Sequence, residues 1–237
     1  AEALHRRVLE RREKILGAEH PDTLTSVEYL ACSLDHLGIF DAAEVMYRRA
    51  LDGGEKTLGA NHSDTLRYAN NLGRLLYEKG DNEGAEVMYR RALEGREKTL
   101  GTRHPETLVS VSDLGLLLYW KGDYRGAEML YRRALEGRGK ALGPQHQETL
   151  SSVGDLVRVI FSRDRVAAKQ FVSDYISLYP ATEKYLNFTL GYFSALEGNL
   201  DAAKLLIASH LEAFPENKAR SMEDPDFAAI RDFIETL

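Results

Sequence analysis

The sequence is poor in cysteine, lacks long apolar runs and has no excess of basic charge. Its 237 residues include one cysteine, Cys32, so no disulfide can form within the chain, and a reducing, cytoplasmic location is expected. No apolar run approaches the roughly 20 residues that span a bilayer, so we expect no membrane partner. The 31 basic and 37 acidic residues give a net charge of −6. Because nucleic-acid binders usually carry a basic face, this balance argues against a nucleic-acid partner.

Sequence motifs that carry catalysis are also missing. We find no nucleotide-binding loop, no zinc-ligand spacing and no nucleophile motif. Gly53 and Gly54 fall inside a predicted helix and are interpreted as a flexible spot rather than a phosphate-binding loop. Ser26, Ser110 and Ser152 fall in the first turns of predicted helices without a patterned base. We therefore expect no enzymatic activity, no cofactor and no metal.

The sequence does contain a unit of 42 residues that occurs four times. The segments AEALHRRVLERREKILG, AEVMYRRALDGGEKTLG, AEVMYRRALEGREKTLG and AEMLYRRALEGRGKALG begin at Ala1, Ala43, Ala85 and Ala127. Their apolar residues have helical spacing, and a glutamate precedes an arginine by four residues, as in Glu44 and Arg48, which favours a helix. Glycine ends this helix in each unit, at Gly17, Gly59, Gly101 and Gly143. A second helix follows, so each unit is predicted to add a helix pair.

A histidine recurs in the loop between the two predicted helices, at His20, His62, His104 and His146. Neighbouring helices pack about 8 to 10 Å apart, whereas zinc ligands must all lie within about 2 Å of one metal. Loops that repeat along a stack of helix pairs cannot converge on one ion. We therefore interpret the histidines as loop residues that are hydrogen-bonded to nearby backbone.

The pattern AEVMYRRALEGREKTLG…HPETL…LG.LLY.KGD, which covers residues 1–163, resembles the 42-residue tetratricopeptide repeats of the kinesin light chain family. The resemblance implies an all-α fold, namely a right-handed α-solenoid of helix-turn-helix repeats. The first unit lacks its first helix, so we expect a truncated repeat at residue 1 and fusion to upstream sequence in the native protein.

Residues 164–237 depart from this pattern and resemble shorter tetratricopeptide repeats. Ala168 and Ala203 correspond at a spacing of 35, as do Pro180 and Pro215. The final stretch EDPDFAAIRDFIETL predicts a C-terminal capping helix that seals the last repeat. We expect residues 1–163 and 164–237 to form one continuous solenoid.

In tetratricopeptide repeats, fixed positions on the first helix of each pair face a concave groove. The resemblance places these residues of the chain at a peptide-binding site: Arg67, Asn70, Asn71, Arg74, Tyr77, Ser112, Asp113, Leu116, Tyr119, Trp120, Arg158 and Phe161. Asn70 and Asn71 match an asparagine pair of the family, which can hold a peptide backbone. We expect Arg67, Arg74 and Arg158 to hold carboxylates of the partner.

These residues predict a non-catalytic scaffold that binds a peptide or helix of a protein partner with acidic and large apolar side chains. Tyr119 and Trp120 would supply apolar contact area. Two alternatives stay open: a regulatory or sensor arm of a larger enzyme (a protease, kinase or nucleotide-binding switch protein), and a self-association module. It also stays open whether the aromatic residues line the groove or are packed away. This concerns Tyr77, Tyr119 and Phe161, which would pack between repeats, and Tyr185, Phe188 and Tyr192, which the terminal helix would cover.

Overall fold

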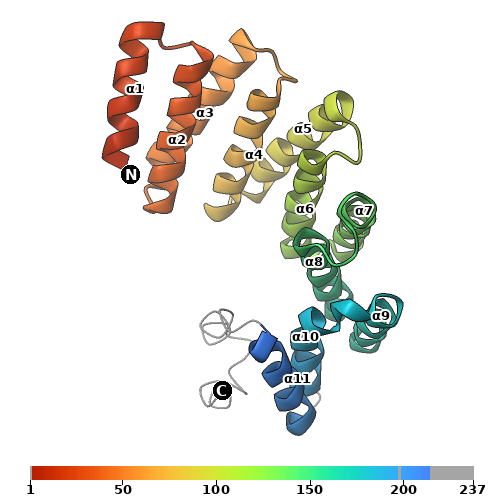
Figure 1. The fold of residues 1–237 in the computed structure, drawn as a ribbon. Coiled ribbons are helices and arrows are strands. Elements are labelled where there is room, and N and C mark those ends of the chain that lie inside the picture. The colour runs from red at the N-terminus through yellow and green to blue at the C-terminus, as the bar shows by residue number, and fades with distance from the viewer. Residues whose placement is uncertain (1, 197–198, 214–237) are drawn as a thin grey trace. The chain divides into compact units, whose positions relative to one another are not determined.

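The structure of the chain is a computed structural model that describes residues 2–196 and 199–213 (Figure 1). Within these residues the chain forms eleven α-helices and one short 3-10 helix, with no β-strand. In chain order the elements are α1 (Glu2–Leu16), α2 (Pro21–His36), α3 (Phe40–Thr57), α4 (Ser63–Glu78), α5 (Asn82–Leu100), α6 (Pro105–Trp120), α7 (Tyr124–Leu142), α8 (Gln147–Arg163), α9 (Arg165–Leu178), η1 (Pro180–Thr182), α10 (Glu183–Leu196) and α11 (Leu200–Ala213). The predicted all-α solenoid is confirmed.

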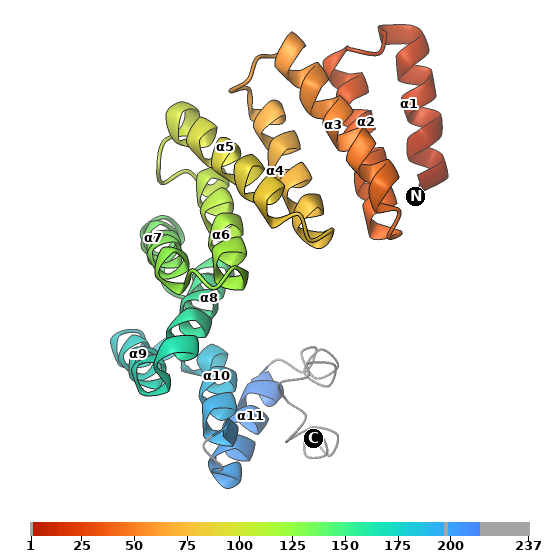
Figure 2. The ribbon, with the colours of Figure 1, turned by 180° about the vertical axis from the view of Figure 1, so that it is seen from behind.

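The chain divides into two compact units, residues 1–137 and 138–237. In the first unit each helix from α1 to α6 packs against the next one in the chain. The first helices of the pairs, α2, α4 and α6, also contact one another in order. Ion pairs join the second helices in the same way, for example Arg49 of α3 with Glu13 of α1 at 2.6 Å. Figure 2, seen from behind, shows α1 to α6 following one another in chain order.

Helix ends in the first unit follow from glycine, at Gly59 as predicted and also at Gly80. Gly59 has a φ of 97° and Gly80 a φ of 86°, which is the left-handed region that glycine enters without a steric penalty. Gly59 ends the helix before the interhelical loop, and Gly80 follows the end of α4. The equivalent glycines of the other repeats share this conformation. The local sequence therefore sets where these helices end.

The core of the first unit uses small residues where helices approach closely. Ala43, Ala85 and Ala127 are fully buried, and Tyr47 beside them is fully buried as well. A Cβ atom added at Gly73 of α4 would lie 3.0 Å from the ring of Tyr89 on α5. A larger residue at these positions would therefore push paired helices apart.

The interpretation of Gly53 and Gly54 as a flexible spot is wrong. Both residues are buried within α3. A Cβ atom at Gly53 would lie 2.5 Å from Leu24 Cδ2, and one at Gly54 would lie 2.9 Å from Thr65 Oγ1 and 3.2 Å from the Tyr68 ring. These glycines let α3 pack tightly against α2 and α4.

In the second unit α8 packs against α9, α9 against α10, and α10 against α11. Ala168 and Ala203, the alanines of the 35-residue spacing, are both fully buried. Gly191 of α10 faces Ile207 of α11, where an added Cβ atom would lie 2.7 Å from Ile207 Cγ1. The predicted capping helix and Pro215 lie outside the described residues.

Candidate functional site

The predicted binding residues of the first unit lie on the neighbouring helices α4 and α6. We call the surface that carries them, together with Glu78, Val109 and the equivalent positions on α2, the first-helix face. Its residues are Thr25, Glu28, Cys32, Asp35 and His36 of α2, Arg67, Asn70, Asn71, Arg74, Tyr77 and Glu78 of α4, and Val109, Ser112, Asp113, Leu116, Tyr119 and Trp120 of α6. Two predicted residues, Arg158 and Phe161, belong to α8 of the second unit.

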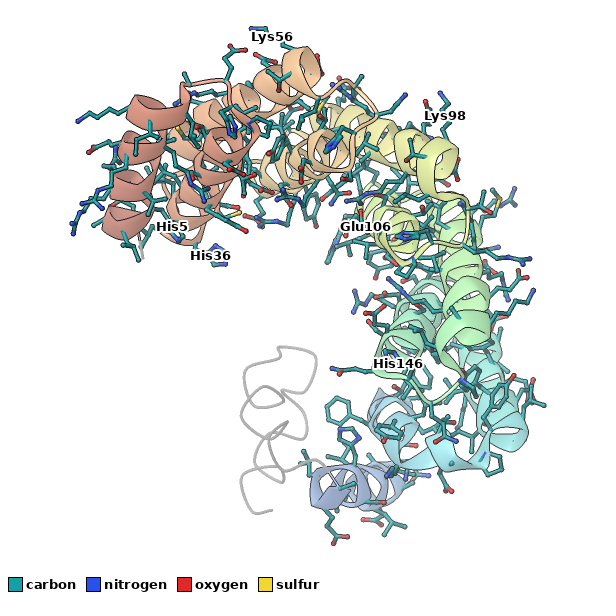
Figure 3. The ribbon with its side chains drawn as sticks, turned by 45° about the horizontal axis from the view of Figure 1, so that its top comes forward. His5, His36, Lys56, Lys98, Glu106 and His146 are labelled. Carbon is teal, nitrogen blue, oxygen red and sulfur yellow. The ribbon has the colours of Figure 1, made fainter. Side chains whose placement is uncertain are left out.

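The repeated histidines begin the helices of this face. Nδ1 of His20, His62 and His104 accepts a hydrogen bond from the backbone N–H two residues later, at 3.2, 3.2 and 3.3 Å. His146, labelled in Figure 3, does the same before α8 at 3.2 Å. Each imidazole is thus the N-cap of its helix. The predicted hydrogen bond to nearby backbone is confirmed. Among the described residues no cluster of three or more potential metal-ligating side chains is found.

Arg67 lies between two carboxylates of this chain. It forms an ion pair with Glu28 of α2, and its Nη2 donates to Asp64 Oδ1 at 2.7 Å. Glu28 is only 1% exposed, and its other oxygen accepts a hydrogen bond from Asn71 Nδ2 at 2.7 Å. The guanidinium also lies 5.1 Å from the centre of the Tyr68 ring. The Glu28 carboxylate therefore joins α2 to two residues of α4.

Arg74 repeats this arrangement two turns later. It forms an ion pair with Asp35 of α2, and its Nη1 donates to Glu78 Oε1 at 2.6 Å. Burial disfavours the charged guanidinium, but Asp35 and Glu78 outweigh this effect and raise the pKa of Arg74 above its ordinary value. Asp35 is 5% exposed, and its Oδ1 has no hydrogen-bond partner within the described part of the chain.

The asparagine pair connects neighbouring repeats in both directions. Asn71 reaches back to Glu28, as described above. Asn70 reaches forward, because its Nδ2 donates to Asp113 Oδ2 of α6 at 2.8 Å and its Oδ1 accepts from Ser110 Oγ at 3.1 Å. Both side-chain amides therefore hold α4 to its neighbours. Whether they also hold a peptide backbone stays a prediction.

The predicted aromatic residues differ in exposure. Trp120 is 61% exposed, whereas Tyr77 and Tyr119 are half-buried. Tyr119 contacts Trp120 edge to face, with ring centres 5.3 Å apart, and Tyr124 of α7 at 5.5 Å. Of the remaining predicted residues of this face, Ser112, Asp113 and Leu116 are half-buried on α6.

In the second unit the predicted residues have a different setting. Phe161 is half-buried and stacks on Phe193 of α10 at 5.0 Å, so here the packed interpretation applies. Arg158 is exposed, and no ion pair joins it to another residue that the structure describes. Phe188 contacts His210 at 5.1 Å, and Tyr185 is half-buried. The side chain of Tyr192 lies outside the described residues.

Sequence reasoning missed a buried contact beneath these helices. Arg96 Nη1 donates to Ser110 Oγ at 2.6 Å, and Arg138 Nη1 donates to Ser152 Oγ at 2.6 Å. The pairs recur with a constant separation of 14 residues. That constant spacing was visible in the sequence, but an arginine near the end of one helix and a serine in the next give no local sign of contact.

Stacked helix pairs with a 42-residue period, held together by contacts between neighbouring repeats, define an α-helical repeat protein. The chain belongs to the tetratricopeptide repeat family, whose model matches residues 1–22, 23–64, 65–106 and 107–148. No curated protein sequence matches the chain at a significant level.

Several solved structures share the fold. BtubC (BKLC) from P. vanneervenii has 19% identity and a TM-score of 0.73, and the match covers 89% of this chain and 88% of that one. A putative kinesin light chain of Podospora anserina with nearly identical TPR-like repeats has 20% identity and a TM-score of 0.71, over 85% and 98% of the two chains. YrrB, a tetratricopeptide repeat protein with an unusual peptide-binding site, has 14% identity and a TM-score of 0.51, over 91% and 94%. In their fold the repeats of this chain therefore resemble those of the kinesin light chain-like structures.

No helix among the described residues combines the length and the apolar character needed to cross a membrane.

Proposed function

We propose that this chain is a non-catalytic binding module whose first-helix face holds a peptide segment or a helix of a partner protein. The tetratricopeptide repeat fold supports a protein–protein interaction scaffold. The likeness to YrrB, a tetratricopeptide repeat protein with a peptide-binding site, is consistent with this role. The single free cysteine supports a reducing, cytoplasmic location for it.

The exposure of Trp120 is the observation that carries the proposal. An indole ring that is 61% exposed on a helix face leaves a large apolar area in water. Burying such a side chain against a partner contributes roughly 1.5–3 kcal/mol, and tryptophan is among the residues most enriched in interface hot spots. Trp120 would therefore be the main apolar anchor of the first-helix face.

Ion pairs within the first unit oppose the binding of acidic side chains of the partner. Arg67 and Arg74 already hold carboxylates of this chain, two of which, those of Glu28 and Asp35, are buried. A partner carboxylate would have to replace Asp64 or Glu78, the half-exposed members of each cluster. Such an exchange trades one ion pair for another and yields little affinity. Our proposal therefore keeps the apolar anchor on the first-helix face and assigns no partner carboxylate to Arg67 or Arg74.

A peptide-library screen with matched variants tests this function. Binding to an immobilised library of random peptides is measured for the intact chain, for Trp120→Ala and for Met129→Ala. Met129 is a suitable control because it is 72% exposed and lies on α7, outside the first-helix face. We expect selected peptides to lose at least about tenfold in affinity with Trp120→Ala and to be unaffected by Met129→Ala. Selected peptides that ignore Trp120 would refute the site, and a library without binders would refute the function.

A further inference from the structure

Resting on the proposed function, we propose that the first-helix face recognises a cationic side chain, arginine or lysine, of its partner. The cation would lie between the Trp120 ring and the carboxylate cluster formed by Asp35, Arg74 and Glu78. This assignment opposes the acidic partner that the sequence predicts.

Acidic charge in the first unit is concentrated on the first helices. The helices α2, α4 and α6 carry two arginines, no lysine and seven carboxylates, namely Asp22, Glu28, Asp35, Asp64, Glu78, Glu106 and Asp113. The second helices α1, α3 and α5 are nearly balanced, with twelve basic and eleven acidic residues. Figure 3 shows Lys56 and Lys98, at the ends of α3 and α5, on the side of the unit away from His36 of α2. The surplus of carboxylates therefore belongs to the three helices of the proposed binding face.

The arginines of this face do not neutralise it. Arg74 is shared between Asp35 and Glu78, so one positive charge faces two negative ones. Arg67 is shared in the same way between Glu28 and Asp64. In the Arg74 cluster one oxygen of the buried Asp35 also lacks a hydrogen bond within the described residues. Each cluster thus keeps a net charge of −1, which favours an incoming cation and opposes an incoming carboxylate.

The exposed tryptophan independently indicates a cation. Trp120 and Glu78 occupy the same position in successive repeats, and their helices α6 and α4 are in contact. Glu78 is 36% exposed at its side chain, so a partner can approach it from solvent. Tryptophan presents the aromatic face that attracts ammonium and guanidinium groups most strongly. An arginine or lysine placed over Trp120 would therefore lie beside the equivalent position of the preceding repeat, where Glu78 ends α4.

Two synthetic peptides test the sign of the recognised charge. Both are acetylated and amidated dodecapeptides with leucines at helical spacing; one carries arginines at the remaining exposed positions and the other glutamates. Binding to the intact chain is followed by calorimetry and by the emission of Trp120, the single tryptophan of the sequence. We expect the arginine peptide to bind at least about tenfold more tightly than the glutamate peptide, with an affinity that falls as salt is added.

Matched variants test whether the preference for the arginine peptide arises at the first-helix face. Glu78→Gln should weaken the arginine peptide by about three- to tenfold, whereas Glu94→Gln, an exposed residue of α5 with the same change in net charge, should leave it unchanged. Trp120→Leu keeps an apolar side chain and should reduce the preference for arginine over glutamate. Circular dichroism confirms that each variant is folded.

The outcomes separate this inference from the proposed function. If the glutamate peptide binds more tightly and its binding requires Trp120, the cationic assignment is overturned while the binding face stands. If the arginine peptide binds equally to the Glu78 and Glu94 variants, its binding reflects the net charge of the chain, and the assignment is again overturned. If neither peptide binds, the assignment fails, and the library screen alone decides the proposed function.

Discussion

Gly54 and Tyr68 show how one residue depends on another in the same repeat. In the first, third and fourth 42-residue repeats the equivalent positions hold arginine and serine, and the two side chains are hydrogen-bonded, as for Arg12 Nη1 and Ser26 Oγ at 2.9 Å. In the second repeat glycine replaces the arginine and tyrosine replaces the serine. The fully buried Tyr68 ring lies 3.2 Å from where a Cβ atom of residue 54 would be. The ring therefore occupies the space that the arginine side chain fills elsewhere.

This exchange predicts strong coupling between the two positions. Gly54→Arg should destabilise the protein by about 3 kcal/mol or more, because the new side chain meets the ring and its charge is buried without a partner. Tyr68→Ser should cost roughly 3 kcal/mol through the cavity that it leaves. The double variant restores the arginine–serine pair. Its loss in free energy of unfolding should therefore be at least about 2 kcal/mol smaller than the sum of the losses of the two single variants. Urea unfolding of the four proteins measures this coupling, and additive losses would contradict it.

Residue identity alone does not reveal exposure. Tyr119 and Phe161 hold the same position in successive units, and the sequence left both open between groove and packing. Phe161 stacks on Phe193, which comes from a helix beyond the 42-residue pattern. Trp120 has no such aromatic neighbour from a later repeat among the contacts described, and it stays 61% exposed.

At the scale of the element, the first helix of each 42-residue repeat begins after a histidine, as α2, α4, α6 and α8 do. The sequence correctly indicated a loop residue bonded to backbone, because a polar residue that precedes Pro21 or Pro105 adjoins a helix start. The sequence did not single out the imidazole as the N-cap, since serine, threonine, aspartate and asparagine are the usual choices. Here Nδ1 takes the place of their side-chain oxygen.

Substitutions at His104 test the cap. His104→Ala removes the acceptor for the N–H of Glu106 and should lower the free energy of unfolding by about 1 kcal/mol. His104→Asn provides a side-chain oxygen in a similar place and should recover most of that loss. Thermal and urea unfolding compare the two variants. An equal loss in both would mean that the imidazole stabilises α6 through packing rather than through its hydrogen bond.

At the scale of the whole molecule, tyrosines that are buried or half-buried occur in both units. Burial raises the pKa of Tyr47 and of Tyr89 in the first unit well above the ordinary value of 10.0. In the second unit burial raises the pKa of Tyr175 to about 12, and its hydroxyl donates to the carbonyl oxygen of Pro144 at 3.1 Å. Each phenol therefore keeps its proton in the folded protein at a pH where the unfolded chain has lost it.

These shifts predict that stability falls in alkali. The contribution of a raised pKa is fully present below the unfolded value near 10 and is lost as the pH rises towards the folded value. The free energy of unfolding should therefore decrease between about pH 10 and pH 12. Urea unfolding at a series of pH values, with phenolate absorbance recorded in parallel, measures this. Tyr175→Phe should reduce the slope, and a flat profile over this range would contradict the assignment.

The sequence by itself determined the repeating unit of this protein. Helix period, glycine ends such as Gly59 and Gly80, and the histidine loops depend on residues that are near one another in the chain, so a 42-residue repeat was enough to predict helix pairs and their stacking. The tertiary structure alone decided which side chains meet. Arg67 and Arg74 find Glu28 and Asp35 across a separation of 39 residues. Such contacts depend on how neighbouring helices are rotated and offset, which no local pattern records, and they decide which charges the face can still offer a partner.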